Sequence, residues 1–466
     1  MRITLLGHAS LLIEMDGATC LMDPVFFDPF EDGAVVSCPK RWVDPEKLPR
    51  IDTLIVSHRH PDHFDLPSLS RVPRDADAIV PTDALIVYAL QKLGFARIHP
   101  VRPMGPIRSN AFELYPTRSA LRSIPEFGLV FKDASGTFWN QADSLLTADT
   151  IAAVVGRFGG IDLLFAMYAS QNFEYFDNRS TEFPYEIHRQ NLENAMRIAP
   201  RWVVPGAAGF RFCGDHAWLN HFLFPISRER FIADLKRLGF GGEIRMMNPG
   251  DVIELDRGRA SYLPAASEIA VTVQDDTAAL RFDPTAPVPD LVDPNPEGWS
   301  RAELERIIDR FVMEGMALYT RSGYATGDRV IDLYRQRAAH YALGIVFAEG
   351  APDWYRFDFE EHAVRIVTGG EAAAGGDIVN RIAASALAGW IADEKNFFYV
   401  RAYSRRYETL YAVSAAGLEV RLQRRVLPDL LMHYLLNVAA GSELAAKHYV
   451  DRQIAALSPT KPMPCC

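Results

Sequence analysis

Residues 57–65 read Ser-His-Arg-His-Pro-Asp-His-Phe-Asp, and this stretch decides how the rest of the sequence is interpreted. It follows the apolar run 53–56, Thr-Leu-Ile-Val, which predicts a buried strand. Three histidines and two carboxylates are therefore expected in a loop at the end of a strand. Imidazole and carboxylate groups are natural ligands for zinc and for non-haem iron. The stretch predicts a metal site.

The spacing within this loop indicates which side chains converge. Because alternate residues of an extended segment face the same side, His58, His60 and Asp62 are expected to point one way. His63 is expected to turn towards a neighbouring ion, and Asp65 to orient a ligand histidine through its other ring nitrogen. A solvated histidine cluster is the alternative, which the preceding hydrophobic strand disfavours.

The His-x-His-x-Asp-His pattern at 58–63 resembles the metal motif of the metallo-β-lactamase superfamily. Residues 7–14, Gly-His-Ala-Ser-Leu-Leu-Ile-Glu, and residues 21–24, Leu-Met-Asp-Pro, look like the opening of one branch. That branch contains L-ascorbate-6-phosphate lactonase, N-acyl-phosphatidylethanolamine phospholipase D and the CMP-N-acetylneuraminate hydroxylase-like proteins. The resemblance covers about residues 1–255. It implies an α/β fold, an αβ/βα sandwich with a metal centre at one edge of its two sheets.

The resemblance assigns ligands residue by residue. His58 and His60 match the pair that binds the first ion, and Asp62 and His63 match the pair that binds the second. The bridging aspartate of the family matches Asp143, at the end of the segment Phe-Trp-Asn-Gln-Ala-Asp. A turn or a helix cap is the alternative role for an aspartate after a strand.

Two ligands of the family have no counterpart at the matching positions. The third histidine of the first ion is replaced by Arg118, and arginine cannot bind a cation because it stays protonated. Arg118 could instead hold a substrate carboxylate or phosphate, or form a structural salt bridge. The last histidine, expected near residues 202–206, is missing from that strand. His216 is the expected substitute ligand, whereas His221 is expected to be a core or surface residue.

Two residues ahead of the motif are expected beside the metal cleft. The resemblance implies that His8 is a hydrogen-bonding or proton-transfer group, with a satisfied core histidine as the alternative. Asp23 precedes Pro24 and is expected to fix its loop near the site. The predicted catalytic residues are Asp62, His8 and Arg118.

The function expected from these residues is that of a metal-dependent hydrolase with one or two zinc ions and a small, anionic substrate. A bound ion lowers the pKa of its water to about 7 and so provides hydroxide at neutral pH. Asp62 or Asp143 would orient this hydroxide, and Arg118 and His8 would stabilise the developing negative charge.

Two other functions stay open. A histidine and carboxylate site with open positions also suits iron, which predicts a non-haem iron or diiron oxygenase with an external electron donor. A degenerate member with a binding role is the third alternative. The Rieske domain of the CMP-N-acetylneuraminate hydroxylase is not expected here, because no cysteine and histidine in the sequence have the spacing that its iron–sulfur cluster needs.

Composition sets the remaining bounds. A chain of 466 residues predicts two or three domains. The net charge of −10 disfavours nucleic-acid binding, which needs a basic surface. No run of about 18 apolar residues predicts a membrane span, and no secretory signal is expected. The five cysteines do not form a disulfide framework, so a cytoplasmic protein is expected, with a homo-oligomer or a redox partner left open.

A proline-rich stretch predicts the domain boundary. Five prolines fall between residues 284 and 296, which indicates an extended linker over residues 276–299. The linker separates a metal-binding domain, residues 1–275, from an α+β domain, residues 300–466. The order of predicted elements in the second domain is loosely similar to that of sterol-carrier-like domains.

The second domain contains predicted elements but no motif tied to chemistry. Ser300 and Glu303 form a capping box that predicts the start of a helix. Residues 378–391 predict another helix and residues 398–403 a strand. The final pair, Cys465–Cys466, resembles a prenylated tail, but a frayed end is the expected state.

Overall fold

The computed structural model describes residues 1–457 except 122, 170, 173, 176–179, 207–208, 374–375, 409–410, 415–416, 421–426 and 436–442. The chain divides into two compact units. Unit 1 consists of residues 1–172, 182–284 and 450–466, and unit 2 consists of residues 173–181 and 285–449. Cys465 and Cys466 lie outside the described residues.

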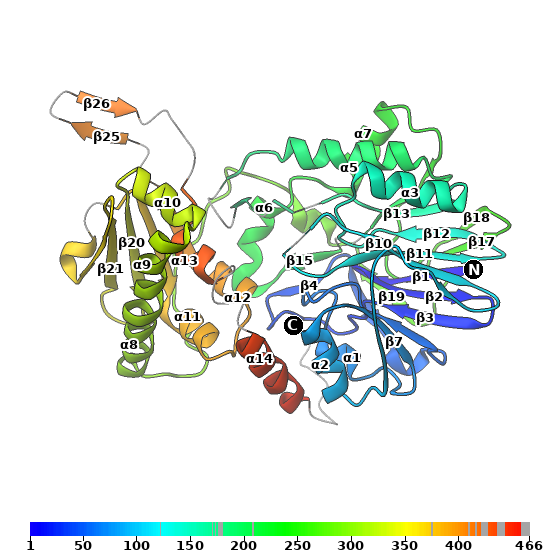
Figure 1. The fold of residues 1–466 in the computed structure, drawn as a ribbon, viewed down its shortest axis with the longest axis horizontal. Coiled ribbons are helices and arrows are strands. Elements are labelled where there is room, and N and C mark those ends of the chain that lie inside the picture. The colour runs from blue at the N-terminus through cyan, green and yellow to red at the C-terminus, as the bar shows by residue number, and fades with distance from the viewer. Residues whose placement is uncertain are drawn as a thin grey trace. The chain divides into compact units, whose positions relative to one another are not determined.

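Unit 1 contains two large β-sheets (Figure 1). In spatial order the first sheet contains β18 (Arg259–Leu263), β17 (Val252–Asp256), β1 (Arg2–Gly7), β2 (Ser10–Met15), β3 (Ala18–Met22), β6 (Thr53–Ile55), β7 (Asp77–Pro81) and β8 (Arg97–Val101). The strands up to β3 are antiparallel, and β6, β7 and β8 then add in parallel. Strand β6 is the buried strand predicted ahead of the histidine motif.

In spatial order the second sheet of unit 1 contains β16 (Glu243–Ile244), β14 (Trp202–Gly206), β13 (Leu163–Met167), β12 (Gly136–Asn140), β11 (Phe127–Asp133), β10 (Glu113–Arg118) and β9 (Ile107–Arg108). The strands from β9 to β12 are antiparallel, whereas β12, β13, β14 and β16 are parallel. Parallel neighbours need crossover connections. Helices α3 (Ala148–Phe158), α5 (Tyr185–Ile198) and α7 (Arg228–Arg237) supply them.

The two sheets pack face to face, and helices cover their outer faces. Ile13 of β2 and Phe138 of β12 belong to one buried cluster between the sheets. The next residue along β12, Trp139, faces the other way and packs against α3, α5 and α7. Helices α1 (Leu66–Leu69) and α2 (Ala84–Lys92) lie on the side of the first sheet (Figure 1). The predicted αβ/βα sandwich is confirmed.

Short elements complete unit 1. Two small two-stranded sheets pair β4 (Val35–Ser37) with β15 (Phe210–Phe212), and β5 (Lys40–Val43) with β19 (Ala270–Gln274). The helical segments are η1 (Pro45–Lys47), η2 (Gly214–Leu219), α6 (Asn220–Leu223) and η3 (Thr277–Leu280).

Unit 2 is built on a mixed five-stranded sheet. In spatial order it contains β22 (Val364–Thr368), β21 (Asp353–Phe359), β20 (His340–Val346), β23 (Ile378–Ala383) and β24 (Ser404–Glu408). Only β20 and β23 pair in parallel within this sheet. Strands β25 (Tyr411–Ser414) and β26 (Gly417–Val420) form a separate hairpin.

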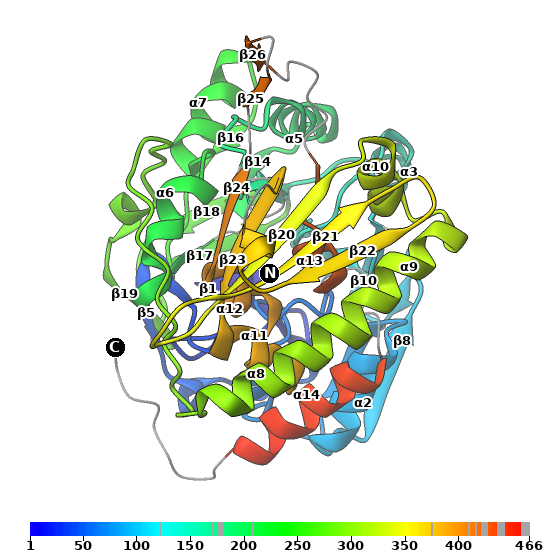
Figure 2. The same cartoon turned by 90° about the vertical axis from the view of Figure 1, so that its left-hand side faces the viewer.

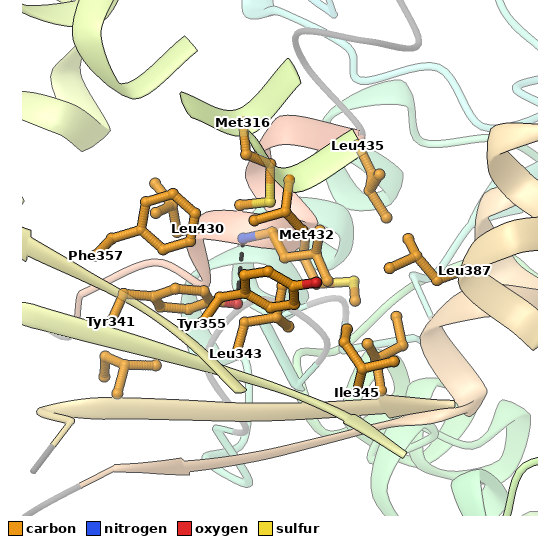
Figure 3. Close-up of a cluster of buried hydrophobic side chains, with 14 of the residues drawn as sticks. Met316, Tyr341, Leu343, Ile345, Tyr355, Phe357, Leu387, Leu430, Met432 and Leu435 are labelled. Atoms are coloured by element: carbon orange, nitrogen blue, oxygen red, sulfur yellow. Dashed lines mark hydrogen bonds between the residues drawn. The ribbon is translucent and has the colours of Figure 1, made fainter. Parts of the chain in front are cut away.

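Helices of unit 2 cover its sheet with an apolar core between them. Helix α8 (Arg301–Arg310), the π-helical segment η4 (Phe311–Met316) and α9 (Ala317–Thr326) form one long helix (Figure 2). The other helical segments are α10 (Arg329–Gln336), η5 (Gly370–Ala373), α11 (Ala384–Ile391), α12 (Phe397–Ala402), α13 (Leu430–His433) and α14 (Glu443–Ala456), and residues 450–456 of α14 are assigned to unit 1. Figure 3 shows the core, where the buried hydroxyl of Tyr341 accepts a hydrogen bond from the Leu431 N–H.

Of the sequence predictions for unit 2, the capping box is confirmed, the helix over residues 378–391 is right only for 384–391, which form α11, and the strand over 398–403 is wrong. The capping box of Ser300 and Glu303 starts α8 as predicted. Residues 378–383 form β23 rather than a helix, because alternate residues are buried and the strand pairs with β20. Residues 397–402 form a helix rather than a strand, because the Asn396 side chain accepts a hydrogen bond from the Tyr399 N–H and caps it.

The predicted linker contains little regular structure. Residues 281–300 are all described, and none of them belongs to a helix or strand. The predicted boundaries 1–275, 276–299 and 300–466 and the sterol-carrier likeness stay predictions. Within the described part of the chain, no helix is both long enough and apolar enough to cross a membrane.

Candidate metal centre

A buried aspartate anchors the histidine loop. Asp23 follows β3, the parallel neighbour of β6, and its carboxylate is fully buried. It accepts hydrogen bonds from the Ser57 N–H at 2.7 Å, from the Ser57 hydroxyl at 2.6 Å and from Nδ1 of His63 at 2.8 Å. Its φ of +46° is a conformation that aspartate tolerates better than most residues. Asp23 therefore fixes both ends of the motif.

These hydrogen bonds determine which ring nitrogens face the site. Because Nδ1 of His63 donates to Asp23, its Nε2 is the nitrogen that carries the lone pair when the ring is neutral. The one proton of the Ser57 hydroxyl goes to Asp23, so this hydroxyl accepts from Nδ1 of His58 at 2.9 Å. Nε2 of His58 is likewise left with a lone pair. Asp65, expected to orient a ligand histidine, instead caps α1 through the Ser68 N–H.

The first group of possible ligands contains His58, His60 and Asp143, whose donor atoms lie within 4.8 Å of one another. Nε2 of His58 is 2.9 Å from Nδ1 of His60 and 3.9 Å from Oδ2 of Asp143. Two ring nitrogens this close need a proton or a cation between them. Burial lowers the pKa of both imidazoles, which favours the neutral form that binds metals.

The second group contains His8, Asp62 and His63. Oδ2 of Asp62 lies 3.8 Å from Nε2 of His63 and 3.0 Å from Nε2 of His8. Nδ1 of His8 accepts a hydrogen bond from the Gly209 N–H at 3.0 Å. The proton of a neutral His8 ring is therefore on Nε2 and points at Asp62. This arrangement suits a residue that orients Asp62 better than one that binds an ion itself.

Asp143 lies between the two groups. Its Oδ2 is 3.5 Å from Nε2 of His63, in addition to its contact with His58. It follows a tight turn in which Ala142 has a φ of +47°. Although burial opposes protonation, the carboxylates of Asp143 and Asp62 raise the pKa of His63 well above its usual value. Carboxylates that hold a proton on a buried imidazole would also stabilise a cation in its place.

The residues present fit a metal ion. Nε2 of His63 is buried and has no hydrogen-bond partner among the described residues, although it faces acidic oxygens. Although burial disfavours its charged form, nearby His63 and the hydrogen bond from His8 lower the pKa of Asp62, so its carboxylate stays ionised. Neutral imidazole nitrogens and carboxylate oxygens are donors that suit both zinc and iron.

Two of the sequence-predicted site residues lie outside these groups. Arg118 is the last residue of β10, and its side chain is exposed and makes no ion pair with the described residues. His216 is buried in η2 and belongs to neither donor group among the described residues. Its assignment as a substitute ligand stays a prediction.

Two buried glutamates near the site were missed by sequence reasoning. Glu31 lies in a loop where its own φ is +51° and that of Asp32 is +55°. Burial, reinforced by the neighbouring Asp62 carboxylate, raises the pKa of Glu31 well above its usual value. Glu126 precedes β11, and burial raises its pKa to about 7. Neither glutamate stands in a motif, so only their burial beside other charged groups identifies them.

Comparison with known proteins now identifies the class of fold. Residues 2–142 match the family described as "Beta-lactamase superfamily domain". This match includes the histidine motif and ends one residue before Asp143. Residues 2–142 of unit 1 are therefore similar to a β-lactamase superfamily domain, and the sandwich around them has the metallo-β-lactamase fold.

Individual relatives extend this similarity. A protein of Mycobacterium tuberculosis, named "Putative Rieske 2Fe-2S iron-sulfur protein", is 27% identical over 234 residues, which are 44% of this chain and 43% of that protein. The chain thus spans less than half of that relative's length. A metal-dependent hydrolase of Caldivirga maquilingensis is 26% identical over 54% of this chain and 96% of its own. The crystal structure of isothiocyanate hydrolase from Delia radicum gut bacteria gives a TM-score of 0.43 at 17% identity, over 55% of this chain and all of that one.

Proposed function

We propose that unit 1 is a metal-dependent hydrolase that acts on a small, anionic substrate. The observation that carries this proposal is that two groups of donor atoms lie side by side. His58 and His60 form one group, Asp62 and His63 belong to the other, and Asp143 approaches a histidine of each. The hydrolase names of the Caldivirga maquilingensis relative and of the isothiocyanate hydrolase agree with it. Zinc, as one or two ions, is the proposed cofactor.

Some of the chain's own residues would bind the ions, and others would orient the attacking water. His58, His60 and Asp143 would hold a first ion, and Asp62, His63 and Asp143 a second. When bound, such an ion supplies a hydroxide nucleophile at neutral pH and a positive charge beside the developing oxyanion. Asp62, oriented by the Nε2 proton of His8, would accept a hydrogen bond from the attacking water and orient it.

Metal removal tests this proposal directly. The protein is dialysed against a chelator and assayed on a panel of esters, lactones and phosphodiesters. We expect hydrolysis of at least one class, loss of that activity on dialysis, and recovery when about one to two equivalents of zinc are added back. Activity that survives complete metal removal would contradict the proposal.

Arg118 provides the second prediction. Its guanidinium at the end of β10 is exposed and has no ion-pair partner among the described residues, so it is suited to bind a carboxylate or phosphate of the substrate. A charged hydrogen bond of this kind contributes about 1.5–3 kcal/mol. We therefore expect Arg118→Ala to raise KM for the anionic substrate by about 10-fold to 100-fold, with metal content unchanged.

Arg108 offers a matched control, since it is an exposed arginine on the neighbouring strand β9. Arg108→Ala should leave KM unchanged. Loss of bound metal from the Arg118 variant with folding intact would argue against a substrate-binding role.

A second candidate function uses iron in the same donor groups. Histidine and carboxylate donors with open positions suit non-haem iron, and the iron–sulfur name of the Mycobacterium tuberculosis relative favours redox chemistry. The chain would then be an oxygenase that takes electrons from a redox partner. Metal content of protein purified without added metal separates the two functions, because the hydrolase should retain zinc and the oxygenase iron.

A further inference from the structure

Glu126 lies next to the strand position of Arg118, where the resemblance implies a third histidine ligand. Strands β10 and β11 are antiparallel, with Arg118 opposite Phe127. Glu126 precedes Phe127 and Ser119 follows Arg118, so Glu126 lies opposite Ser119, next to the place of the missing third histidine. The side chain of Arg118 is exposed to solvent, whereas Glu126 is buried, with only 7% of its surface exposed.

Hydrogen bonds tie Glu126 to the elements that carry the ligands. The Ser119 hydroxyl oxygen accepts from the N–H groups of Leu121 and Leu145, each at 3.1 Å, so its own proton is donated to the Glu126 carboxylate. Leu145 follows Asp143 by two residues. On the other side, the Phe127 N–H donates to the carbonyl of Ser57 at 3.3 Å, immediately before the first ligand histidine.

The charge of Glu126 is costly unless a cation offsets it. Burial raises the pKa of its carboxyl group to about 7, and the carboxylate of Asp143 acts in the same direction. The imidazole of His63 acts in the opposite direction. A carboxylate buried this close to the ligand residues responds to the charge in the metal site, and a bound cation would stabilise its ionised form.

We infer that Glu126 is a positioning carboxylate of the metal site, which supports the ion held by His58, His60 and Asp143 from the side where the third histidine is absent. Glu126 is not a member of the group of donor atoms within 4.8 Å, so it acts through Asp143 and through water rather than as a direct ligand. Its negative charge compensates for the lost histidine by strengthening ion binding. This inference rests on the proposed function of unit 1.

Glu126→Gln tests the inference because glutamine keeps the shape and still accepts from Ser119 but lacks the charge. Zinc affinity is measured by competition with a chromophoric chelator, and cobalt absorption spectra report the ion's surroundings. We expect zinc affinity to fall by about 10-fold to 100-fold, the usual effect of losing a group that supports a ligand, and the cobalt bands to shift. Glu126→Asp, which keeps the charge, should lie closer to the wild type in both measurements.

Glu113 provides the matched control, because it lies on the same strand pair at the far end of β10 and pairs with exposed arginines. Glu113→Gln should leave zinc affinity unchanged. If the wild type binds zinc but Glu126→Gln binds it equally well, Glu126 is a structural partner of Ser119 and the inference fails alone. If the wild type binds no transition metal, the proposed function fails and the inference fails with it.

Discussion

Asp143→Asn is expected to abolish hydrolysis and to remove most of the bound metal. Asparagine keeps the size of the side chain but loses the charge that faces both His58 and His63. Because Asp143 is shared by the two donor groups, both ions lose a ligand at once. Loss of about 4 kcal/mol of charge stabilisation corresponds to a decrease in kcat/KM on the order of 10³-fold. Elemental analysis and the hydrolysis assay measure the two effects.

Asp149→Asn is the control for this variant, since Asp149 is exposed in the first turn of α3, six residues further along the chain. It should keep both its metal and its activity. An Asp143→Asn protein that folds and retains about the wild-type metal content would show that Asp143 is the turn or helix-cap aspartate considered as the alternative.

Asp23→Ala is expected to have the largest effect on stability. The substitution leaves the Ser57 N–H, the Ser57 hydroxyl and Nδ1 of His63 without their shared acceptor in a fully buried position. Breaking such a buried charged network costs about 3–5 kcal/mol. We therefore expect Tm to fall by roughly 6 °C or more in a unit of this size. Zinc affinity should also fall by about 10-fold to 100-fold, because His63 is no longer oriented.

Asp16→Ala provides the comparison, because Asp16 lies in the exposed turn between β2 and β3, the latter being the strand that Asp23 follows. Its Tm should stay within about 1 °C of the wild type, as is usual for surface substitutions. A similar Tm and zinc affinity for Asp23→Ala and the wild type would mean that the loop is held in another way.

The sandwich of unit 1 could be predicted from the resemblance that the histidine motif carries, and single strands could be predicted from local signals. The apolar run 53–56 and the histidines after it identify a strand that ends at a functional loop, and β6 ends there. In unit 2 the same reasoning failed at residues 378–383. The β-branched residues Ile378, Val379 and Ile382 favour a strand, and pairing with β20, which lies far away in the sequence, establishes that strand where the start of a helix was expected. Propensity cannot show a pairing of this kind.

The candidate site was predictable where a motif carried it and not elsewhere. His58, His60, Asp62, His63 and Asp143 come from a spacing that the resemblance recognises, and the structure brings them together. Other residues of the candidate site could not be predicted, because strand register and not distance in the sequence determines which side chains are neighbours. Glu126 is an example, because the register of β10 and β11 brings it opposite Ser119, which is hydrogen-bonded to Leu145 just after Asp143.

The same dependence on the fold explains why the sequence predicts Asp65, and not Asp23, as the residue that orients a histidine. Asp65 is two residues from His63 in the sequence, whereas Asp23 is forty residues away and reaches it through the parallel pairing of β3 with β6. Its acceptor role for His63 could be found only from the three-dimensional structure.

Anomalous diffraction from crystals of the metal-loaded protein tests the central claim most directly. Data collected on both sides of the zinc and iron absorption edges would locate each metal and identify it. The account predicts a peak bounded by His58, His60 and Asp143, and, where a second ion binds, another bounded by Asp62, His63 and Asp143. Metal peaks confined to other residues, or no peak in protein that retains its activity, would contradict it.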